Sequence, residues 1–375
     1  MEIIELIFWF SFSTLALVYF GYYTLCWYTV KTKSLKTKKK NSYRPHVSLV
    51  VATWNEENTI EGKLKNTFEL KYPKNKLEVI VIDSGSTDRT KEIVKKFKRV
   101  RLIDEKKRKG KAHALNKAFK ECKEEIIVIS DADCRLKKDV LIKSMPYFYD
   151  PNVGALTGKQ ELINPRENLT TKIEQEYRDF YYILRKAEST IDSTFIFHGE
   201  FSAFRKKLIT NIFEDSVADD SELALRIRKK GYRTLLLPEA KYWEYAPPKL
   251  SERVKQKYRR AQGLVQIMSR FFSTFFMKPK YGHFGLLIFP TEFFMHVISP
   301  FLIVLALITM FFLPLNLLVL IILGVGGALL IKRTRIFLLT FLHSQYACLK
   351  GMITYAISGP SKSWEKIFGT RRYES

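Results

Sequence analysis

The feature that most constrains this chain is the placement of its apolar residues. Residues 6–30 include no charged side chain, and tryptophan and tyrosine gather toward one end of this run. A helix of about 20 apolar residues crosses the hydrocarbon core of a bilayer, and such rings anchor it at the interface. The sequence therefore predicts a transmembrane helix over residues 1–30. A cleaved signal peptide is the alternative, but basic residues follow the run and no small-residue cleavage site is present.

A basic segment follows the first apolar run. Residues 31–44, KTKSLKTKKKNSYR, contain no acid, so the positive-inside rule predicts a cytosolic linker over residues 31–45 and an N-terminus outside the cell. The whole chain has 63 Lys and Arg against 38 Asp and Glu, a formal charge of +25. That excess indicates an anionic partner: phosphate groups, nucleic acid or an anionic lipid surface.

The C-terminal third is apolar again. Apart from two histidines, Glu292 is the only acidic or basic residue in residues 281–331, a stretch long enough for two transmembrane helices that divide near Pro314. Residues 332–335, KRTR, return the chain to the cytoplasm. Residues 336–358 carry His343, Gln345 and Lys350, which favours an interfacial or re-entrant helix, with a third span as the alternative. We predict an interfacial helix and a basic cytosolic tail over residues 332–375, and an integral plasma-membrane protein.

Between the apolar segments, residues 46–246 alternate strand and helix patterns. Strands are predicted over residues 46–54, 77–83, 100–104, 125–130 and 234–238, and helices over residues 55–70, 86–97, 111–122, 170–190 and 221–233. Such alternation predicts an α/β domain with a mostly parallel, Rossmann-like sheet. An amphipathic interfacial region over residues 247–280 joins it to the membrane segments. Ligands of such sheets bind beyond the carboxyl ends of the strands.

Acidic residues follow two of the predicted strands. Asp83 ends the second strand, and Asp131 and Asp133 follow the buried run Ile126-Ile127-Val128-Ile129. If the chain turns at Ala132, both carboxylates can approach one cation, and Mg²⁺ prefers carboxylates together with phosphate oxygens. The alternative is a solvated turn after a strand.

A second acidic cluster precedes a predicted helix. Asp219 and Asp220 are adjacent, and Glu222 follows. Repulsion between neighbouring carboxylates raises the pKa of one of them, which suits a general base. A helix N-cap is the alternative for one member of the cluster.

Basic residues supply candidate phosphate ligands. Lys111 opens a helix after a basic, glycine-containing loop, an arrangement that suits phosphate. Arg259 and Arg260 can hold a diphosphate through their guanidinium groups. For most of the basic residues in 253–260, however, contact with anionic lipid headgroups is the favoured interpretation.

These motifs, in this order, resemble the membrane-embedded inverting nucleotide-sugar glycosyltransferases of the GT-A fold, the superfamily of cellulose, chitin and hyaluronan synthases. The resemblance covers about residues 47–263. ATWNEE resembles the family's opening strand, VIDSGSTDRT its Asp-Asp-Gly-Ser-x-Asp motif with Ser84 in place of the second aspartate, and DAD its Asp-x-Asp motif. ADDSELALRI resembles the motif that contains the catalytic base, and QKYRR resembles Gln-x-x-Arg-Trp with Arg260 at the tryptophan position.

The resemblance implies a role for each matched residue. Asp220 is the implied catalytic base, and Asp131 and Asp133 are the implied ligands of Mg²⁺ or Mn²⁺. The implied nucleotide-sugar ligands are Thr53, Trp54, Asn55, Glu56, Asp83, Lys111, Asp131, Gln256 and Arg259. The implied acceptor-side residues are Gly199, Glu200, Asp219 and Arg260.

The predicted function is a membrane glycosyltransferase that moves a sugar, with inversion, from a nucleotide diphosphate sugar to a lipid-linked or growing glycan acceptor at the cytoplasmic face. Asp83 and Trp54 favour a UDP-sugar, and membrane lipids but not nucleic acid are expected partners. Arg260 and the small number of spans favour short products or a lipid acceptor. One alternative is a polyprenyl-phosphate glycosyltransferase that adds a single sugar. Another is a non-enzymatic, membrane-tethered module that binds anions.

Overall fold

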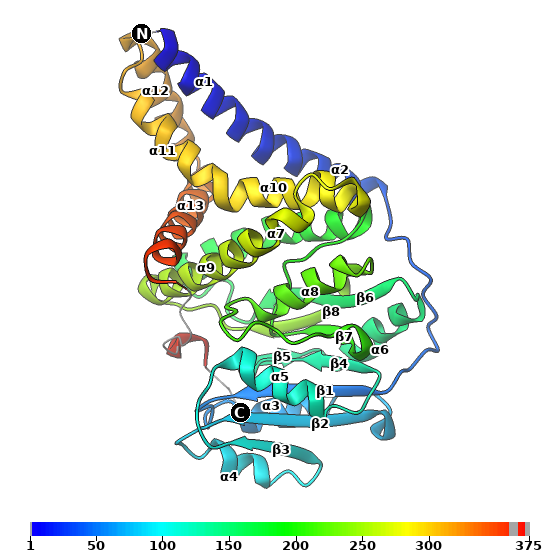
Figure 1. Ribbon diagram of the computed structural model, residues 1–375. Helices are drawn as coiled ribbons and strands as arrows, with labels where there is room; N and C mark the ends of the chain where they lie inside the picture. Colours follow the sequence, from blue (N-terminus) through cyan, green and yellow to red (C-terminus); the bar gives the residue numbers. More distant parts are fainter. Residues whose placement is uncertain (1, 360–366, 372–375) are drawn as a thin grey trace.

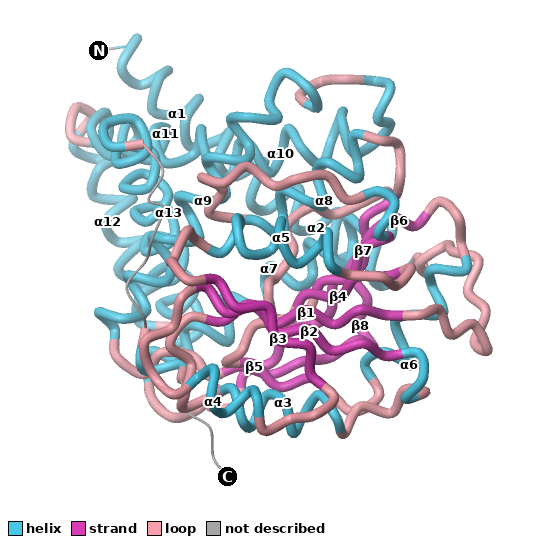
Figure 2. Tube along the Cα trace, turned by 60° about the horizontal axis from the view of Figure 1, so that its bottom comes forward, coloured by secondary structure: helices cyan, strands magenta, loops and turns pink. Residues whose placement is uncertain are grey.

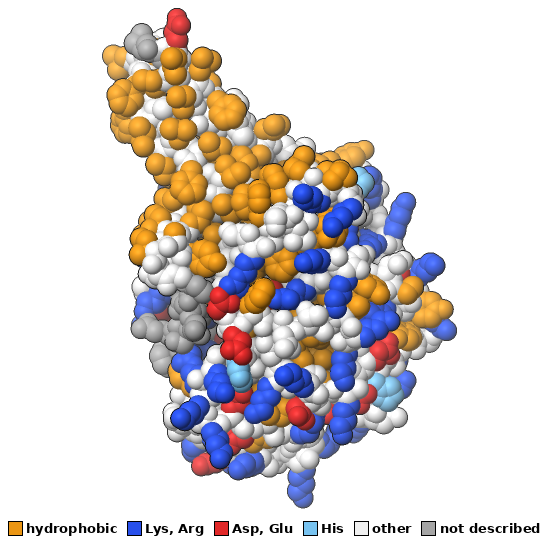
Figure 3. Space-filling model, viewed as in Figure 1, with side chains coloured by type: hydrophobic (Ala, Val, Ile, Leu, Met, Phe, Trp, Pro, Cys, Tyr) orange, Lys and Arg blue, Asp and Glu red, His pale blue; other side chains and the backbone are white. Residues whose placement is uncertain are grey.

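The computed structural model describes residues 2–359 and 367–371. Figure 1 shows an α/β body joined, through a layer of long helices, to a narrow bundle of apolar helices that includes the first helix of the chain. Hydrophobic side chains cover the bundle, whereas Lys and Arg are scattered over the body (Figure 3). This division of side chains follows the apolar and charged segments of the sequence.

The body contains one sheet of eight strands in the order β3-β2-β1-β4-β7-β6-β8-β5. The strands are β1 (Val47–Thr53), β2 (Leu77–Ser84), β3 (Val100–Glu105), β4 (Ile126–Ile129), β5 (Cys134–Leu136), β6 (Val153–Leu162), β7 (Ser202–Arg205) and β8 (Arg233–Glu244). The first four run parallel in one half of the sheet, and β7 and β5 are antiparallel to their neighbours. The predicted mixed, mostly parallel α/β sheet is confirmed.

Helices cover both faces of the sheet (Figure 2). They are α3 (Ile60–Phe68), α4 (Thr90–Lys95), α5 (Lys111–Glu121), α6 (Val140–Ser144), α7 (Leu169–Ile191), α8 (Asp219–Lys229) and α9 (Leu250–Phe275). Successive strand side chains point to opposite faces. Val50 of β1 therefore packs in the core with α5, α8 and α9, and its neighbours Leu49 and Val51 pack in the core with α3, α4 and α6.

Two helices begin later than the sequence pattern predicts. The helix expected from residue 55 starts at Ile60, and the one expected from residue 86 starts at Thr90. The intervening loops bind each other instead. The side chain of Asn55 accepts a hydrogen bond from the Thr87 amide at 2.7 Å, and Asn55 adopts a left-handed backbone with φ of 54°. These hydrogen-bonded loops lie at the carboxyl ends of β1 and β2.

Strand β8 is longer than the predicted strand over residues 234–238. It continues past Pro238 because the register to β6 shifts after Gly158, which leaves the proline within a bulge where its missing N–H is tolerated. A Cβ atom on Gly158 would lie 2.1 Å from the Ala240 carbonyl oxygen, so only glycine fits beside this bulge.

Three apolar helices are long enough to cross a membrane by length and composition: Glu2–Thr32, Phe284–Met310 and Thr334–Ser358. The helix α12 (Leu315–Leu330), from the second half of the predicted pair, is shorter at 16 residues. Residues 336–358 form part of the continuous helix α13 (Lys332–Ser358), so the length of the helix permits the third span as well as the interfacial placement. Most of the predicted basic tail lies outside the described residues.

Two basic residues of α9 face the interior of the protein instead of lipid. Arg253 and Lys257 are buried and form ion pairs with Glu174 of α7 at 3.1 and 3.0 Å. Lipid contact as the interpretation of these two residues is therefore wrong. Their charges hold α9 against α7, since a buried carboxylate needs close cationic partners.

Candidate active site

A cavity of about 370 Å³ lies at the carboxyl ends of the parallel strands, where ligands of such sheets bind. Thr53 ends β1, Ser84 ends β2, Asp131 follows β4 and Lys111 opens α5, and all four line the cavity. Asp219 and Asp220, at the start of α8, line it from the other side. The fold thus brings the two acidic clusters of the sequence into one site.

The chain turns between β4 and β5 at the Asp131-Ala132-Asp133 segment, as the metal-site hypothesis requires. The Asp131 amide donates a hydrogen bond to the Gly199 carbonyl at 3.0 Å, and its carboxylate accepts one from Lys111 Nζ at 2.8 Å. Burial opposes ionisation of Asp131, yet the charge of Lys111 holds its pKa below the usual value. Asp131 is therefore ionised at neutral pH.

Asp133 stands in a different electrostatic environment on the same turn. Burial raises its pKa to about 6, and the negative charge of Asp131 adds to the shift. A divalent cation between these carboxylates would reverse that shift by favouring the ionised form. Both side chains line the cavity, and both offer the oxygen atoms that Mg²⁺ and Mn²⁺ accept.

The donor set fits a cation shared with a substrate. Within the described part of the chain, no three His, Cys, Asp or Glu side chains form a complete metal site. Two carboxylates together with diphosphate oxygens match the usual coordination of Mg²⁺, which binds one or two protein carboxylates and the phosphate oxygens of the substrate. Asp131 and Asp133 are therefore the residues that would hold a metal here, and Asp133 faces no lysine or arginine at ion-pair distance among the described residues.

Sequence reasoning missed a lysine beneath this turn. Lys63 of α3 is fully buried, and its Nζ donates to Ser130 Oγ at 2.6 Å and to the Cys134 carbonyl at 3.2 Å. These two residues bracket the Asp-x-Asp turn. A lysine flanked by apolar residues in a helix gives no sequence signal of such a role.

We expect Lys63→Met to weaken metal-dependent nucleotide binding by about tenfold, because the turn loses the donors that fix both of its ends. The unpaired Ser130 and Cys134 acceptors should also cost about 1–3 kcal/mol of stability. Calorimetric titration of Mn²⁺ with nucleoside diphosphate checks the first effect, and thermal unfolding checks the second. A variant that loses stability but keeps its metal affinity would show that Lys63 serves the fold alone. Lys65→Met, on the exposed side of the same helix, is the control.

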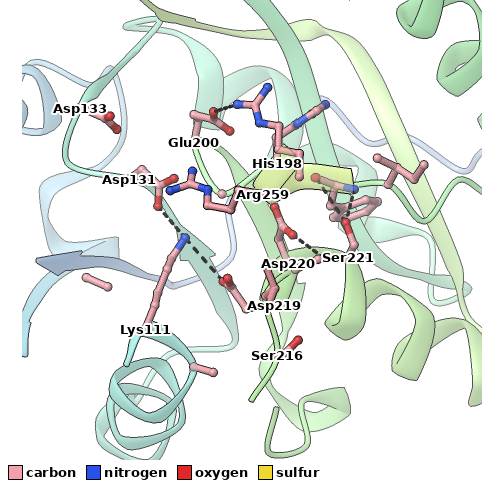
Figure 4. A pocket seen from close by; sticks show the side chains of 18 of the residues that line it. Lys111, Asp131, Asp133, His198, Glu200, Ser216, Asp219, Asp220, Ser221 and Arg259 are labelled. Carbon is pink, nitrogen blue, oxygen red and sulfur yellow. Dashed lines mark hydrogen bonds and ion pairs between the residues drawn. The ribbon is translucent and has the colours of Figure 1, made fainter. Parts of the chain in front are cut away.

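Asp219 and Asp220 form the first turn of α8 (Figure 4). Asp220 accepts a hydrogen bond from the Ser221 amide at 2.6 Å, and Lys111 Nζ lies 3.6 Å from Asp219 Oδ2. Burial and the neighbouring Asp219 raise the pKa of Asp220 to about 7. Both interpretations of this cluster are therefore compatible. The two aspartates begin the helix, and Asp220 has a pKa that suits a general base. Glu222 is buried and bonds Arg226 at 2.7 Å, which is a structural role.

Cationic groups surround the space beside Asp131. Lys111, Arg108 and Arg259 all line the cavity. Gly199 lies against this cluster, and a Cβ there would be 2.8 Å from both Lys111 Nζ and Asp131 Oδ2. Glycine at this position therefore keeps the ion pair of Lys111 and Asp131 together. The arrangement provides positive charge next to a proposed metal, as a diphosphate requires.

The predicted nucleotide ligands divide into two groups. Thr53, Trp54 and Glu56 line the cavity, and the guanidinium carbon of Arg108 lies 3.4 Å from the centre of the Trp54 ring. Asn55, Asp83 and Gln256 do not line it. Asp83 is fully buried and accepts hydrogen bonds from Ser86 N at 2.8 Å and Thr53 Oγ1 at 3.2 Å. In this structure Asp83 supports the loop below the cavity, and a direct contact with a base stays a prediction.

The predicted acceptor-side residues also line the cavity. Arg260 Nη2 lies 3.3 Å from Glu200 and 3.4 Å from Glu244. Burial raises the pKa of Glu200 well above its usual value, and the adjacent Glu244 adds to the shift. Arg260 therefore bridges the side chains of two glutamates, of which Glu200 lines the cavity. Its role toward an acceptor stays a prediction.

A second element was missed because it lies far along the chain. Arg371 lines the cavity and pairs with Glu56 at 2.9 Å, and Thr370 Oγ1 donates to Asp133 at 3.3 Å. Sequence patterns do not show that a residue of the C-terminal tail returns to the start of the domain. Glu56, which is predicted to contact the nucleotide, is therefore paired with Arg371 in this structure.

Residues 45–263 match the family described as "Glycosyltransferase like family 2". The poly-beta-1,6-N-acetyl-D-glucosamine synthase of Staphylococcus aureus is 30% identical over 243 residues, which is 62% of this chain and 58% of that protein. The Staphylococcus epidermidis synthase of the same name is 27% identical over 248 residues, 64% of this chain and 60% of its own. The chain thus spans about three fifths of these relatives.

A solved structure resembles almost the whole chain. The mannosyltransferase PcManGT from Pyrobaculum calidifontis, in complex with GDP-Man and Mn²⁺, superposes with a TM-score of 0.78 at 30% identity, covering 94% of this chain and 99% of that one. The predicted GT-A fold is confirmed by this match and by the family match. With its family match over more than half its length, the chain belongs to glycosyltransferase family 2.

Proposed function

We propose that this chain transfers a sugar, with inversion, from a nucleoside diphosphate sugar to a hydroxyl group of a lipid-linked or glycan acceptor, with a divalent cation bound. The observation that carries the proposal is one cavity that contains the Asp131–Asp133 turn, Lys111 and Asp220 together. Family membership supports the reaction class, and the membrane-type helices support an acceptor at a membrane surface.

The proposed mechanism is a single displacement at the anomeric carbon. Asp220 takes the proton of the acceptor hydroxyl as that oxygen attacks. Lys111 and Arg259 stabilise the negative charge that develops on the leaving diphosphate. A cation held by Asp131 and Asp133 would supply further charge compensation at the same phosphate oxygens. No covalent bond to the enzyme forms, so one displacement inverts the anomeric configuration.

The proposal extends to the nucleobase of the sugar donor. The sequence favours uridine through Trp54 and Asp83, and the solved mannosyltransferase holds GDP-Man. GDP-mannose is therefore the first donor to test, and UDP-N-acetylglucosamine and UDP-glucose are the next. Purified full-length protein is incubated with each donor, Mn²⁺ and a mixture of octyl glycosides and polyprenyl phosphate as acceptors, and release of the nucleoside diphosphate is measured. Release from one donor supports the proposal, whereas no release from any nucleotide sugar contradicts it.

We also propose that the catalytic domain lies on the cytoplasmic face and the N-terminus outside. The basic residues of 31–45 follow the first apolar helix, and positively charged loops stay inside. A cysteine introduced beside Tyr43 should react with a membrane-impermeant thiol label in inside-out vesicles. The same cysteine should stay unlabelled in intact cells. The alternative of a non-enzymatic anion-binding module explains the basic surface but gives no role to a raised-pKa aspartate beside a carboxylate pair.

The pH dependence of the reaction should report Asp220. A base must be deprotonated to act, so kcat/KM should rise with pH and reach half its plateau near the pKa of about 7. Asp219→Asn removes the negative charge that helps to raise this pKa, so its midpoint should move to lower pH. Initial rates over a pH series check both results. An unchanged midpoint in Asp219→Asn would contradict the assignment of the titrating group.

A further inference from the structure

Residues of α7 also line the active-site cavity. Tyr177, Tyr181 and Tyr182 line it, together with Arg178, Gln160 and Arg260. We call these six residues the α7 lobe. The lobe belongs to the same cavity as Asp220 but contains none of the implied nucleotide-sugar ligands, metal ligands or the base, and Arg260 is its one implied acceptor-side residue.

We propose that the α7 lobe binds the terminal sugar ring of a neutral, membrane-anchored glycan. Such a glycan would be the acceptor of the proposed glycosyltransferase. The inference rests on the proposed function, because a lobe that opens onto Asp220 has an acceptor role only if Asp220 is the base. It selects a glycan over the phosphate group of a polyprenyl phosphate.

The aromatic residues carry the first part of the argument. Tyr177 and Tyr181 lie one helical turn apart, with ring centres 4.6 Å from each other, and all three tyrosines are half-buried. A cation lies over each ring: Lys257 over Tyr177, Arg185 over Tyr181 and Lys159 over Tyr182. A sugar would therefore stack on the opposite face of a ring, beside the tyrosine hydroxyl. The C–H face of a sugar ring stacks on such rings, and its hydroxyl groups reach the polar atoms around them. A phosphate group makes no use of an apolar face.

The two arginines of the lobe already contact glutamate oxygens of the protein. Arg178 bonds Glu174 at 3.1 Å and also contacts Glu244, and Arg260 lies between Glu200 and Glu244. A phosphate site needs guanidinium forks that are free to bind it. Paired arginines and carboxylates instead present hydrogen-bond donors and acceptors side by side, which matches sugar hydroxyl groups.

One donor in the lobe has no partner. Arg178 is 7% exposed, and its Nη1 is buried without a hydrogen bond to any described residue. A buried donor left unpaired costs free energy. A hydroxyl or ring oxygen of a bound sugar would satisfy it.

One residue of the cavity lining belongs to an apolar helix. His296, which also lines the cavity, belongs to the candidate span Phe284–Met310, and Arg185 of α7 bonds Glu292 of that helix at 3.1 Å. An acceptor that is held in the membrane beside this helix would therefore lie near the cavity that contains Asp220. This placement favours a lipid-anchored glycan over a free one.

The experiment uses two kinds of acceptor with the full-length protein, in a detergent that contains no sugar. Octyl glycosides of mannose, glucose and N-acetylglucosamine represent the anchored sugar, and decaprenyl phosphate represents the lipid phosphate. Sugar transfer to at least one octyl glycoside, but not to decaprenyl phosphate, is expected. Transfer to decaprenyl phosphate alone, or donor hydrolysis that no octyl glycoside converts to transfer, would overturn the inference. Absence of any donor turnover would instead mean that the proposed function fails, and the inference with it.

Variants of Tyr181 test the lobe itself. Tyr181→Ala should raise the KM for the octyl glycoside about tenfold, and Tyr181→Phe should restore most of the affinity because it keeps the ring. The dissociation constant of the nucleoside diphosphate with Mn²⁺ should stay as in the wild type, which shows that the protein is folded. Tyr149→Ala, an exposed tyrosine outside the cavity, is the matched control. An unchanged acceptor KM in both Tyr181→Ala and Tyr177→Ala would contradict the proposal.

Discussion

Asp220→Asn is expected to reduce kcat by about 10²–10⁴-fold, the range that a positioned general base contributes. The amide has nearly the size of the carboxylate, so the cavity keeps its shape, but the amide does not accept the proton of the acceptor hydroxyl. Asp220 contacts the Ser221 amide and no described cation at ion-pair distance, so the binding of nucleoside diphosphate should be preserved. Transfer rates and calorimetric binding, measured on the same preparation, separate the two effects.

The matched control for this variant lies in the loop that precedes α8. Asp215→Asn makes the same chemical change at a side chain that pairs with Arg270 and does not line the cavity. It should leave kcat within about twofold of the wild type, as a change outside the catalytic machinery does. If Asp220→Asn keeps wild-type transfer, another residue of the cavity is the base.

Asp133→Asn is expected to abolish metal-dependent binding of the donor. Loss of a residue that only supports a metal ligand costs about 10–100-fold in affinity, so the loss of a direct ligand should cost at least about 100-fold. Asp131→Asn should have an effect of similar size and should also release Lys111 from its ion pair. Titration of Mn²⁺ in the presence of nucleoside diphosphate measures the change.

The control for the metal variants is Asp139→Asn. Asp133 directly precedes β5, whereas Asp139 lies just after that strand and pairs with Lys143 at 2.9 Å on the surface. Its substitution should leave metal-dependent binding intact. Equal Mn²⁺ affinity in the wild type and in Asp133→Asn would show that Asp133 is not a ligand.

The strands and the acidic clusters were predictable because their signals are local. Four consecutive apolar residues before Asp131 mark a buried strand, and the carboxyl ends of parallel strands meet at one edge of a sheet. Those two facts place Asp131 beside the ends of β1 and β2 without knowledge of any contact. Asp219 and Asp220 were recognised by their adjacency and by the family motif.

The errors arose where distant residues decide the local structure. The loop at residues 55–59 is not helical because Asn55 bonds the loop after β2, and this partner lies 32 residues away. Arg253 and Lys257 read as lipid-facing residues because their partner, Glu174, lies 79 and 83 residues earlier in the chain. Periodicity describes a single element, so it does not report a buried ion pair between α7 and α9 or the approach of Arg371 to Glu56.

The most direct test of the central claim, a metal-dependent glycosyltransferase with one active-site cavity, is nucleoside diphosphate release by the purified full-length protein before and after chelation. With the donor found in the screen and an accepted octyl glycoside, release should occur in Mn²⁺, stop when the metal is chelated and return when Mn²⁺ is restored. Release that continues at the same rate in the presence of the chelator would contradict the account.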